Sequence, residues 1–164
     1  MKILVCGLPG SGKTWLAGRL ISHIKDCAWY NADIVRKCAN DWDYSLEGRI
    51  RQAKRMKAFA DFERLHGRWV ICDFIAPTEK AREAFAPDYV IWLDTIKEGR
   101  VVQSKISELK EIKNLPFDAN SLSRSKEFED TNKIFEKPSK IDIHVTHFMN
   151  DNEIKKISEE ISRV

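Results

Sequence analysis

The sequence predicts an α/β fold, in which a parallel sheet of five strands is covered by helices on both faces. Two observations support this prediction. Short apolar runs alternate along the chain with segments whose apolar residues recur at helical spacing. The short runs are also hydrophobic throughout rather than at every second position, which is typical of strands buried on both faces of a parallel sheet.

The first half of the chain contains three predicted strands and three predicted helices. The strands are expected at 2–6, 27–31 and 69–74, and the helices at about 14–25, 34–39 and 46–66. An apolar stripe marks the longest helix, which Gly67 ends. The stripe consists of Leu46, Ile50, Ala53, Met56, Ala60 and Phe62.

The second half continues the alternation with a helix after Pro77 and a strand at 89–94. A polar, charged segment at about 97–137 is expected to be partly helical and to form a lid or substrate segment. The fifth strand is expected at 141–146 and the last helix at 153–164. In such a sheet, ligands bind beyond the carboxyl ends of the strands, so the chemistry should lie there.

Length and composition favour one soluble domain over residues 1–164. Lys and Arg number 28 against 25 Asp and Glu, and 43% of the residues are hydrophobic, which is usual for globular proteins. The longest apolar runs fall far short of the roughly 20 residues that span a bilayer, and no apolar leader precedes the first run. We therefore expect a cytoplasmic protein rather than a secreted or membrane protein.

The four cysteines favour reduced thiols over a zinc site or disulfides. Cys6, Cys27 and Cys72 lie in predicted strands, and no C-x-x-C pair occurs. The histidines are distant from the cysteines in sequence, which argues against a shared zinc ion.

A glycine-rich motif follows the first predicted strand and opens the first predicted helix. It matches G-x-x-x-x-G-K-[ST] without a mismatch, and strand and helix stand where this phosphate-binding loop requires them. The predicted ATP-binding residues of the loop are Gly7, Leu8, Pro9, Gly10, Ser11, Gly12, Lys13 and Thr14. Lys13 is expected to reach the β- and γ-phosphates, and Thr14 to ligate Mg²⁺.

Asp73 ends an apolar strand in the manner of a Walker-B acid, so it is the second predicted Mg²⁺ ligand. The alternative is an ordinary strand-end Asp that caps the next turn. The guanine-specifying Asn-Lys-x-Asp is absent from the sequence, and motors usually need a longer chain. A small kinase using ATP and Mg²⁺ fits best.

Several short motifs, taken in order, resemble the adenylylsulfate kinase-like group of P-loop kinases. They are Asp33-Ile-Val-Arg36, Tyr44-Ser45 with Arg49, Gln52 and Arg55, Ile75-Ala-Pro77, Leu93-Asp94-Thr95, and Phe135-Glu-Lys-Pro138. The resemblance implies a three-layer α/β/α sandwich. It also implies an acceptor side at Arg36, Tyr44, Arg49, Gln52, Arg55 and Ile75, and further ATP-side residues at Arg100, Phe135 and Pro138. Core packing is the alternative for Phe135 and Pro138, and Lys105 and Arg124 compete with Arg100 as the lid cation.

The chain also departs from the pattern of this group. The group's Asp-Gly-Asp is Asn31-Ala32-Asp33 here, and its lid motif is missing after Asp94. Residues 129–133 resemble a compact phage branch that phosphorylates 5-hydroxymethyluracil in DNA. Asn31, Asp33 and Arg36 are similar to an element of polynucleotide 5′-kinases.

These resemblances favour an acceptor hydroxyl on DNA that carries a modified base, in the host cytoplasm if the protein is phage-encoded. The basic run from Arg49 to Lys57 supports a nucleic-acid grip, although such runs are often only solvated faces. The alternatives are adenylylsulfate, a small anionic nucleotide, as the acceptor; a polynucleotide 5′-hydroxyl; and a nucleotide-binding protein without catalysis. A homodimer is left open.

Asp33 is the expected catalytic base, acting with Lys13 and Arg36. It follows the second strand, so it should face the phosphate loop and orient an attacking hydroxyl. Arg36, one helical turn later, would bind an acceptor phosphate or steady Asp33. Trp42 and Tyr44 could stack on a base or close the core. The alternative for Asp33 is a plain helix N-cap.

Overall fold

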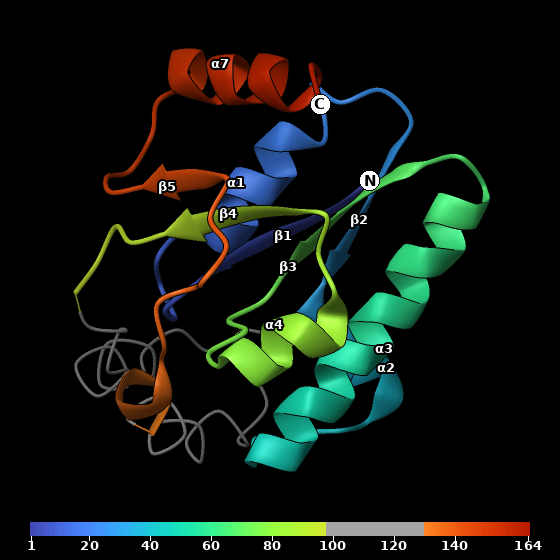
Figure 1. Cartoon of the computed structure of the whole chain (residues 1–164), viewed down its shortest axis with the longest axis vertical. Helices are drawn as coiled ribbons and strands as arrows, with labels where there is room; N and C mark the ends of the chain where they lie inside the picture. The colour runs from blue at the N-terminus through green and yellow to red at the C-terminus, as the bar shows by residue number, and fades with distance from the viewer. Residues whose placement is uncertain (98–129) are drawn as a thin grey trace, which may run out of the picture.

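The computed structural model describes residues 1–97 and 130–164, and it confirms the predicted parallel sheet. Its strands are β1 (Lys2–Gly7), β2 (Cys27–Asn31), β3 (Trp69–Asp73), β4 (Tyr89–Leu93) and β5 (Ile143–Val145). They lie in the order β2-β3-β1-β4-β5, and each neighbouring pair is parallel. All carboxyl ends therefore share one edge of the sheet (Figure 1).

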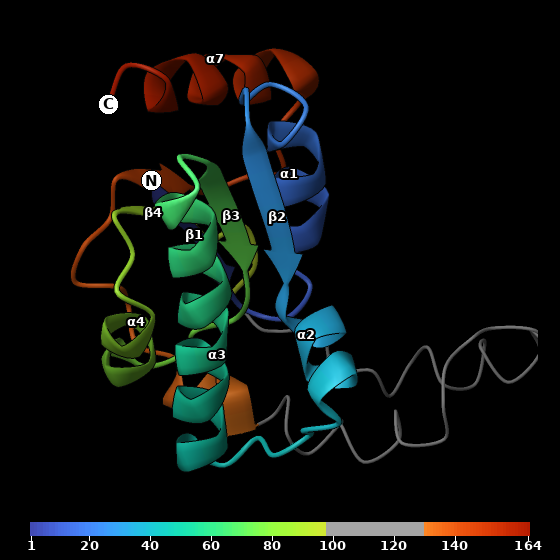
Figure 2. The same ribbon diagram turned by 90° about the vertical axis from the view of Figure 1, so that its right-hand side faces the viewer.

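Helices cover both faces of the sheet, as the sequence predicts. The helices α1 (Lys13–Leu20) and α7 (Asp151–Ile161) lie on one face, and α3 (Leu46–Leu65) and α4 (Glu79–Phe85) lie on the other (Figure 2). The short helix α2 (Ala32–Ala39) continues from the end of β2 and packs on α3. A further helical turn at 130–134 precedes β5.

Two apolar cores explain why the strands are hydrophobic at every position. Ile3 and Val5 of β1 face α1 and α7, whereas Leu4 and Cys6 face α3 and α4. All four side chains are fully buried, and alternate residues of a strand point to opposite faces. A strand covered on both sides therefore has no position left for an exposed polar residue.

The apolar stripe predicted for α3 is partly wrong. Leu46 and Phe62 are more than half exposed, while Gln52 and Glu63 are buried. The buried polar groups have partners: Gln52 Nε2 donates to the Ala32 carbonyl, and Glu63 accepts from the Tyr30 hydroxyl at 2.6 Å. Small and flexible side chains at Ala53, Met56 and Ala60 fill the rest of the buried face.

Element boundaries differ from the prediction at α1 and at the last strand and helix. The helix α1 ends at Leu20 rather than near Lys25, because the Ser22 and His23 amides donate three residues back, to Arg19 and Leu20. The strand β5 spans only Ile143–Val145, and α7 begins at Asp151. Ile24 nevertheless packs into the core beside α1, although it lies outside the helix.

The cysteines of the described residues are free thiols, and three of them lie in strands as expected. Cys6 and Cys72 are buried, and burial raises the pKa of Cys6 to about 12. No helix in the described ranges is both long enough and apolar enough to cross a membrane. Most of the expected lid segment, including Arg100, Lys105 and Arg124, lies outside the described residues.

Candidate active site

A pocket of about 700 Å³ opens over the carboxyl ends of the central strands. The phosphate loop and the start of α1 line one side. The opposite side is formed by α2, the first turns of α3 and residues 74–77, which follow β3. The pocket lies where the topology of a parallel sheet predicts a ligand site.

The backbone of the phosphate loop adopts conformations that glycine permits. Gly10 and Gly12 have φ values of 87° and 96°, in the left-handed region. Gly7 passes so close to β4 that a Cβ there would lie 2.4 Å from the Leu93 carbonyl oxygen. The Thr95 hydroxyl donates to the Ser11 carbonyl at 2.8 Å, which ties the loop to the chain just beyond β4.

Lys13 is the side chain of this loop that is suited to an anionic ligand. Lys13 lines the pocket, and its ammonium group donates to the Leu8 carbonyl at 2.9 Å. Burial lowers the pKa of Lys13 to about 8, so a bound anion would favour its charged form. The Ser11 hydroxyl is buried and has no hydrogen-bond partner within the described ranges. The position and charge of Lys13 fit a phosphate group.

Asp73 lies at the centre of a hydrogen-bond cluster on the floor of the pocket. Its carboxylate accepts from the Thr14 hydroxyl at 2.7 Å, from Trp29 Nε1 at 2.7 Å and from Asn31 Nδ2 at 2.9 Å. Burial raises its pKa, and these three hydrogen bonds oppose that shift. The Asp73 carboxylate and Thr14 hydroxyl are the oxygen donors that Mg²⁺ prefers. No cluster of three or more His, Cys, Asp or Glu side chains suited to a metal occurs in the part of the chain that the structure describes.

Trp29 contacts the candidate Mg²⁺ ligand Asp73, and the sequence analysis did not identify it. Its only sequence signal is its place on β2, beside the strand that ends in Asp73. Asn31 pairs directly with Asp73 in the register of β2 and β3. The hydrogen bond from the Trp29 indole to the Asp73 carboxylate depends on how β2 and β3 pack, and no local sequence motif predicts it.

Asn31, rather than Asp33, is the N-cap of α2. The Asn31 side-chain oxygen accepts from the Asp33 and Ile34 amides. Asp33 is exposed and lines the pocket, and its carboxylate makes no hydrogen bond to any described residue. The alternative that Asp33 is the helix N-cap is therefore wrong. The Asp33 carboxylate is available to a ligand.

The buried Arg36 and the half-buried Tyr44 form a pair on the predicted acceptor side. Arg36 is 5% exposed, and its Nη1 donates to the carbonyls of Asp41 at 3.0 Å and Asp43 at 2.9 Å. Its guanidinium lies over the Tyr44 ring, 4.5 Å from the centroid. Burial lowers the pKa of Arg36, although a guanidinium stays charged.

Three more of the predicted acceptor-side residues line the pocket, namely Arg49, Gln52 and Ile75. Arg49 is buried and donates to the Tyr44 carbonyl at 2.8 Å and to the Thr131 hydroxyl at 2.9 Å. Arg55 is not among the lining residues, and its guanidinium binds the Asp41 carboxylate at 2.8 Å.

Of the residues expected on the ATP side beyond the phosphate loop, Arg100 lies outside the described residues, and the other two do not line this pocket. Phe135 packs against the core beneath α3 and α4, and Pro138 is buried; neither lines the pocket. Instead, Phe148 and Trp15 stand at the mouth of the phosphate loop. Phe148 is 59% exposed, and its ring would lie 3.4 Å from a Cβ at Gly12. The one sequence signal for Phe148 is an aromatic residue in the loop between the last strand and the last helix.

Known proteins with similar sequences and structures include adenylylsulphate kinases. The family model described as adenylylsulphate kinase matches residues 1–146. A probable adenylyl-sulfate kinase of Aeropyrum pernix is 32% identical over 89 residues, which are 49% of this chain and 46% of that protein. The chain thus aligns with about half the length of this curated relative.

Solved structures share the fold at lower identity. The crystal structure of APE1195 has a TM-score of 0.78 at 22% identity and covers 100% of this chain and 96% of that one. An APS kinase of Mycobacterium tuberculosis, in complex with AMPPNP and APS, has a TM-score of 0.67 at 18% identity, covering 99% and 95%. Shikimate kinase from Aquifex aeolicus has a TM-score of 0.57 at 16% identity, covering 99% and 96%. The fold is therefore that of P-loop kinases, and the match over residues 1–146 shows that the chain belongs to the adenylylsulphate kinase family.

Proposed function

We propose that the protein is an ATP-dependent kinase that phosphorylates a hydroxyl of a small anionic nucleotide, with adenylylsulfate as the first candidate. One observation carries the proposal. A single pocket joins the phosphate loop to a wall that contains two buried arginines, Arg36 and Arg49. The family match supports the same reading.

The phosphate-loop side fits ATP with Mg²⁺. The ammonium of Lys13 and the loop amides would hold the β- and γ-phosphates. Thr14 and Asp73 would hold the ion, which neutralises charge on the phosphates when bound. Asn31 and Trp29 keep the Asp73 carboxylate oriented through their hydrogen bonds. Phosphoryl transfer depends chiefly on such placement and charge neutralisation.

On the acceptor side, Asp33 would accept the proton of the attacking hydroxyl. That oxygen forms a bond to the γ-phosphorus, the bond from the γ-phosphorus to the bridging β-γ oxygen breaks, and ADP leaves. Arg36 and Arg49 would bind the anionic part of the acceptor, and Tyr44 offers an aromatic face.

A hydroxymethyluracil in DNA is the second candidate acceptor. The basic run of α3 is one of the sequence arguments for it, beside the resemblances and the missing lid motif, and the ion pairs of this run weaken that argument. Arg51 and Arg55 already bind the carboxylates of Asp41 and Asp43. None of the relatives named above is described as acting on DNA. Adenylylsulfate therefore takes first place.

The test offers γ-labelled ATP and Mg²⁺ with four acceptors in parallel: adenylylsulfate, duplex DNA containing hydroxymethyluracil, plain duplex DNA and a 5′-hydroxyl oligonucleotide. Label is expected on adenylylsulfate. Label only on the modified DNA would reverse the order of the candidates, and label only on the oligonucleotide would reassign the enzyme to 5′-end phosphorylation. Transfer to none of the four, with ATP bound normally, would refute the proposal.

Asp33→Asn tests the proposed base. The kcat should fall by roughly 10²–10⁴-fold, because proton acceptance in the transition state is lost, while ATP affinity stays unchanged. Asp151→Asn is the matched control, since Asp151 is also an exposed acid in the first turn of a helix, away from the pocket. Full activity in Asp33→Asn would remove Asp33 from the mechanism.

A further inference from the structure

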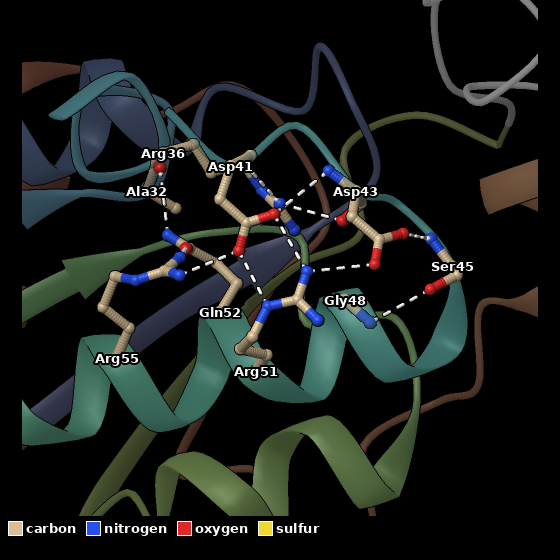
Figure 3. Close-up of polar contacts among 9 residues, drawn as sticks. All are labelled: Ala32, Arg36, Asp41, Asp43, Ser45, Gly48, Arg51, Gln52 and Arg55. Carbon is tan, nitrogen blue, oxygen red and sulfur yellow. Dashed lines mark hydrogen bonds and ion pairs between the residues drawn. The ribbon is translucent and has the colours of Figure 1, made fainter. Parts of the chain in front are cut away.

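The connection between α2 and α3, residues 40–45, is fastened to α3 by a charged cluster outside the pocket. Asp41 is its centre. Its carboxylate accepts two hydrogen bonds from Arg51, at 2.9 and 3.0 Å, and one from Arg55 at 2.8 Å (Figure 3). The Asp41 side chain is 14% exposed and that of Arg55 is 24% exposed, whereas that of Arg51 is 50% exposed, so solvent reaches the cluster from the Arg51 side.

Two further contacts hold the same connection down. The Asp43 carboxylate binds Arg51 at 3.0 Å and accepts from the Ser45 amide at 2.9 Å. Gly48 of α3 lets the connection approach the helix, because a Cβ at position 48 would lie 2.4 Å from the Asp43 carbonyl oxygen. The close approach depends on backbone contact as well as on charge.

The backbone of this connection holds the acceptor side of the pocket. The carbonyls of Asp41 and Asp43 receive both hydrogen bonds of Arg36 Nη1 (Figure 3), and the Tyr44 carbonyl receives that of Arg49 Nε. Arg36 also lies over the Tyr44 ring. A shift of this connection would therefore move three pocket residues together.

We propose that Asp41 is a positioning residue for acceptor binding: by fastening residues 40–45 to Arg51 and Arg55, it sets Arg36 and Tyr44 in the orientation that receives an anionic acceptor. The inference rests on the proposed kinase function for the identity of the acceptor. It assigns to Arg51 and Arg55 a role in holding the connection, in place of direct contact with a substrate.

Asp41→Asn tests this role by removing the charge and leaving one acceptor oxygen. The KM for adenylylsulfate should rise on the order of tenfold, which corresponds to about 1.4 kcal/mol of binding free energy. The KM for ATP should not change, because the phosphate loop lies on the other side of the pocket. Amide hydrogen exchange over residues 40–45 should accelerate. Asp41→Glu keeps the carboxylate and should recover most of the affinity.

Two more variants separate positioning from a general loss of stability. Asp61→Asn removes an acid of α3 that is likewise bound to two cations, Lys2 and Lys57, but whose ion pairs do not involve residues 40–45. It should lower the melting temperature without raising the KM for adenylylsulfate. Gly48→Ala leaves every charge in place and pushes the connection away from α3, so it should reproduce the effect of Asp41→Asn on the KM and on exchange.

Each readout can overturn the inference by itself. Unchanged exchange at 40–45 in Asp41→Asn would show that the carboxylate does not fasten the connection. Faster exchange with an unchanged KM for adenylylsulfate would show that the connection does not position the acceptor. A wild-type protein that neither binds nor phosphorylates adenylylsulfate would refute the proposed function instead. The exchange rates and calorimetry with each of the other three acceptors would then decide the role of Asp41.

Discussion

At the scale of single residues, one departure from the family pattern acquires a structural meaning. Asn31 stands where the family resemblance has an aspartate, and its amide performs two tasks. The oxygen caps α2, and the nitrogen donates to Asp73 and, at 3.2 Å, to the Thr14 hydroxyl. An aspartate would cap equally well but would place a second carboxylate beside the buried Asp73. Asparagine therefore keeps the helix start and avoids that repulsion.

Phe148 provides the prediction at this scale. Its ring is exposed and lies beside Gly12, so we predict that it stacks on the base of a nucleotide held by the phosphate loop. Phe148→Ala should weaken ATP binding about tenfold, since stacking on an aromatic side chain contributes ~1–3 kcal/mol per base. Isothermal titration calorimetry with ATP and Mg²⁺ measures the change.

A matched control is available on α3. Phe62 is 57% exposed, close to the 59% of Phe148, and it does not line the pocket. Phe62→Ala should leave ATP affinity at the wild-type value. Equal affinities for wild type and Phe148→Ala would place the base elsewhere.

At the scale of elements, two helix caps lie beside different parts of the molecule, so we expect their loss to have different effects. The helix α7 begins with a capping box between Asn150 and Glu153, and α4 begins with Thr78, whose hydroxyl accepts from the Ala81 amide. Asn150→Ala and Thr78→Ala should each cost about 1 kcal/mol of folding stability. That loss lowers the melting temperature by roughly 2–4 °C in a chain of this size.

Only Thr78→Ala should also raise the KM for the acceptor. The cap of α4 adjoins Pro77 and Ala81, which line the acceptor side, whereas α7 packs on α1. Differential scanning calorimetry and the KM for adenylylsulfate, measured on both variants, check this. A rise of that KM in Asn150→Ala alone would contradict the assignment.

The sequence predicts elements best where local chemistry decides them. The phosphate loop, the strands and the order of the helices follow from a complete motif and from continuous apolar runs. The buried face of α3 does not, because Gln52 and Glu63 are buried by partners from distant parts of the chain, Ala32 and Tyr30. The ion pairs of Arg51 and Arg55 with Asp41 could not be predicted for the same reason. The sequence shows only a basic run, and Asp41 comes into contact with it through the fold.

At the scale of the whole molecule, the distribution of charge favours a small acceptor over a long polyanion. The net charge is only +3, and two arginines of the basic run are neutralised at the surface. The buried arginines of the pocket can meet one or two anionic groups.

Binding of adenylylsulfate should therefore weaken only slightly with salt, with a log–log slope of no more than about two, whereas each DNA phosphate gripped adds about 0.9. Calorimetric titrations between low and high KCl measure the slope, and Arg51→Gln should leave it unchanged because Asp41 and Asp43 already pair with that guanidinium. A slope of about five or more with duplex DNA, reduced by Arg51→Gln, would show instead that α3 grips a phosphate backbone.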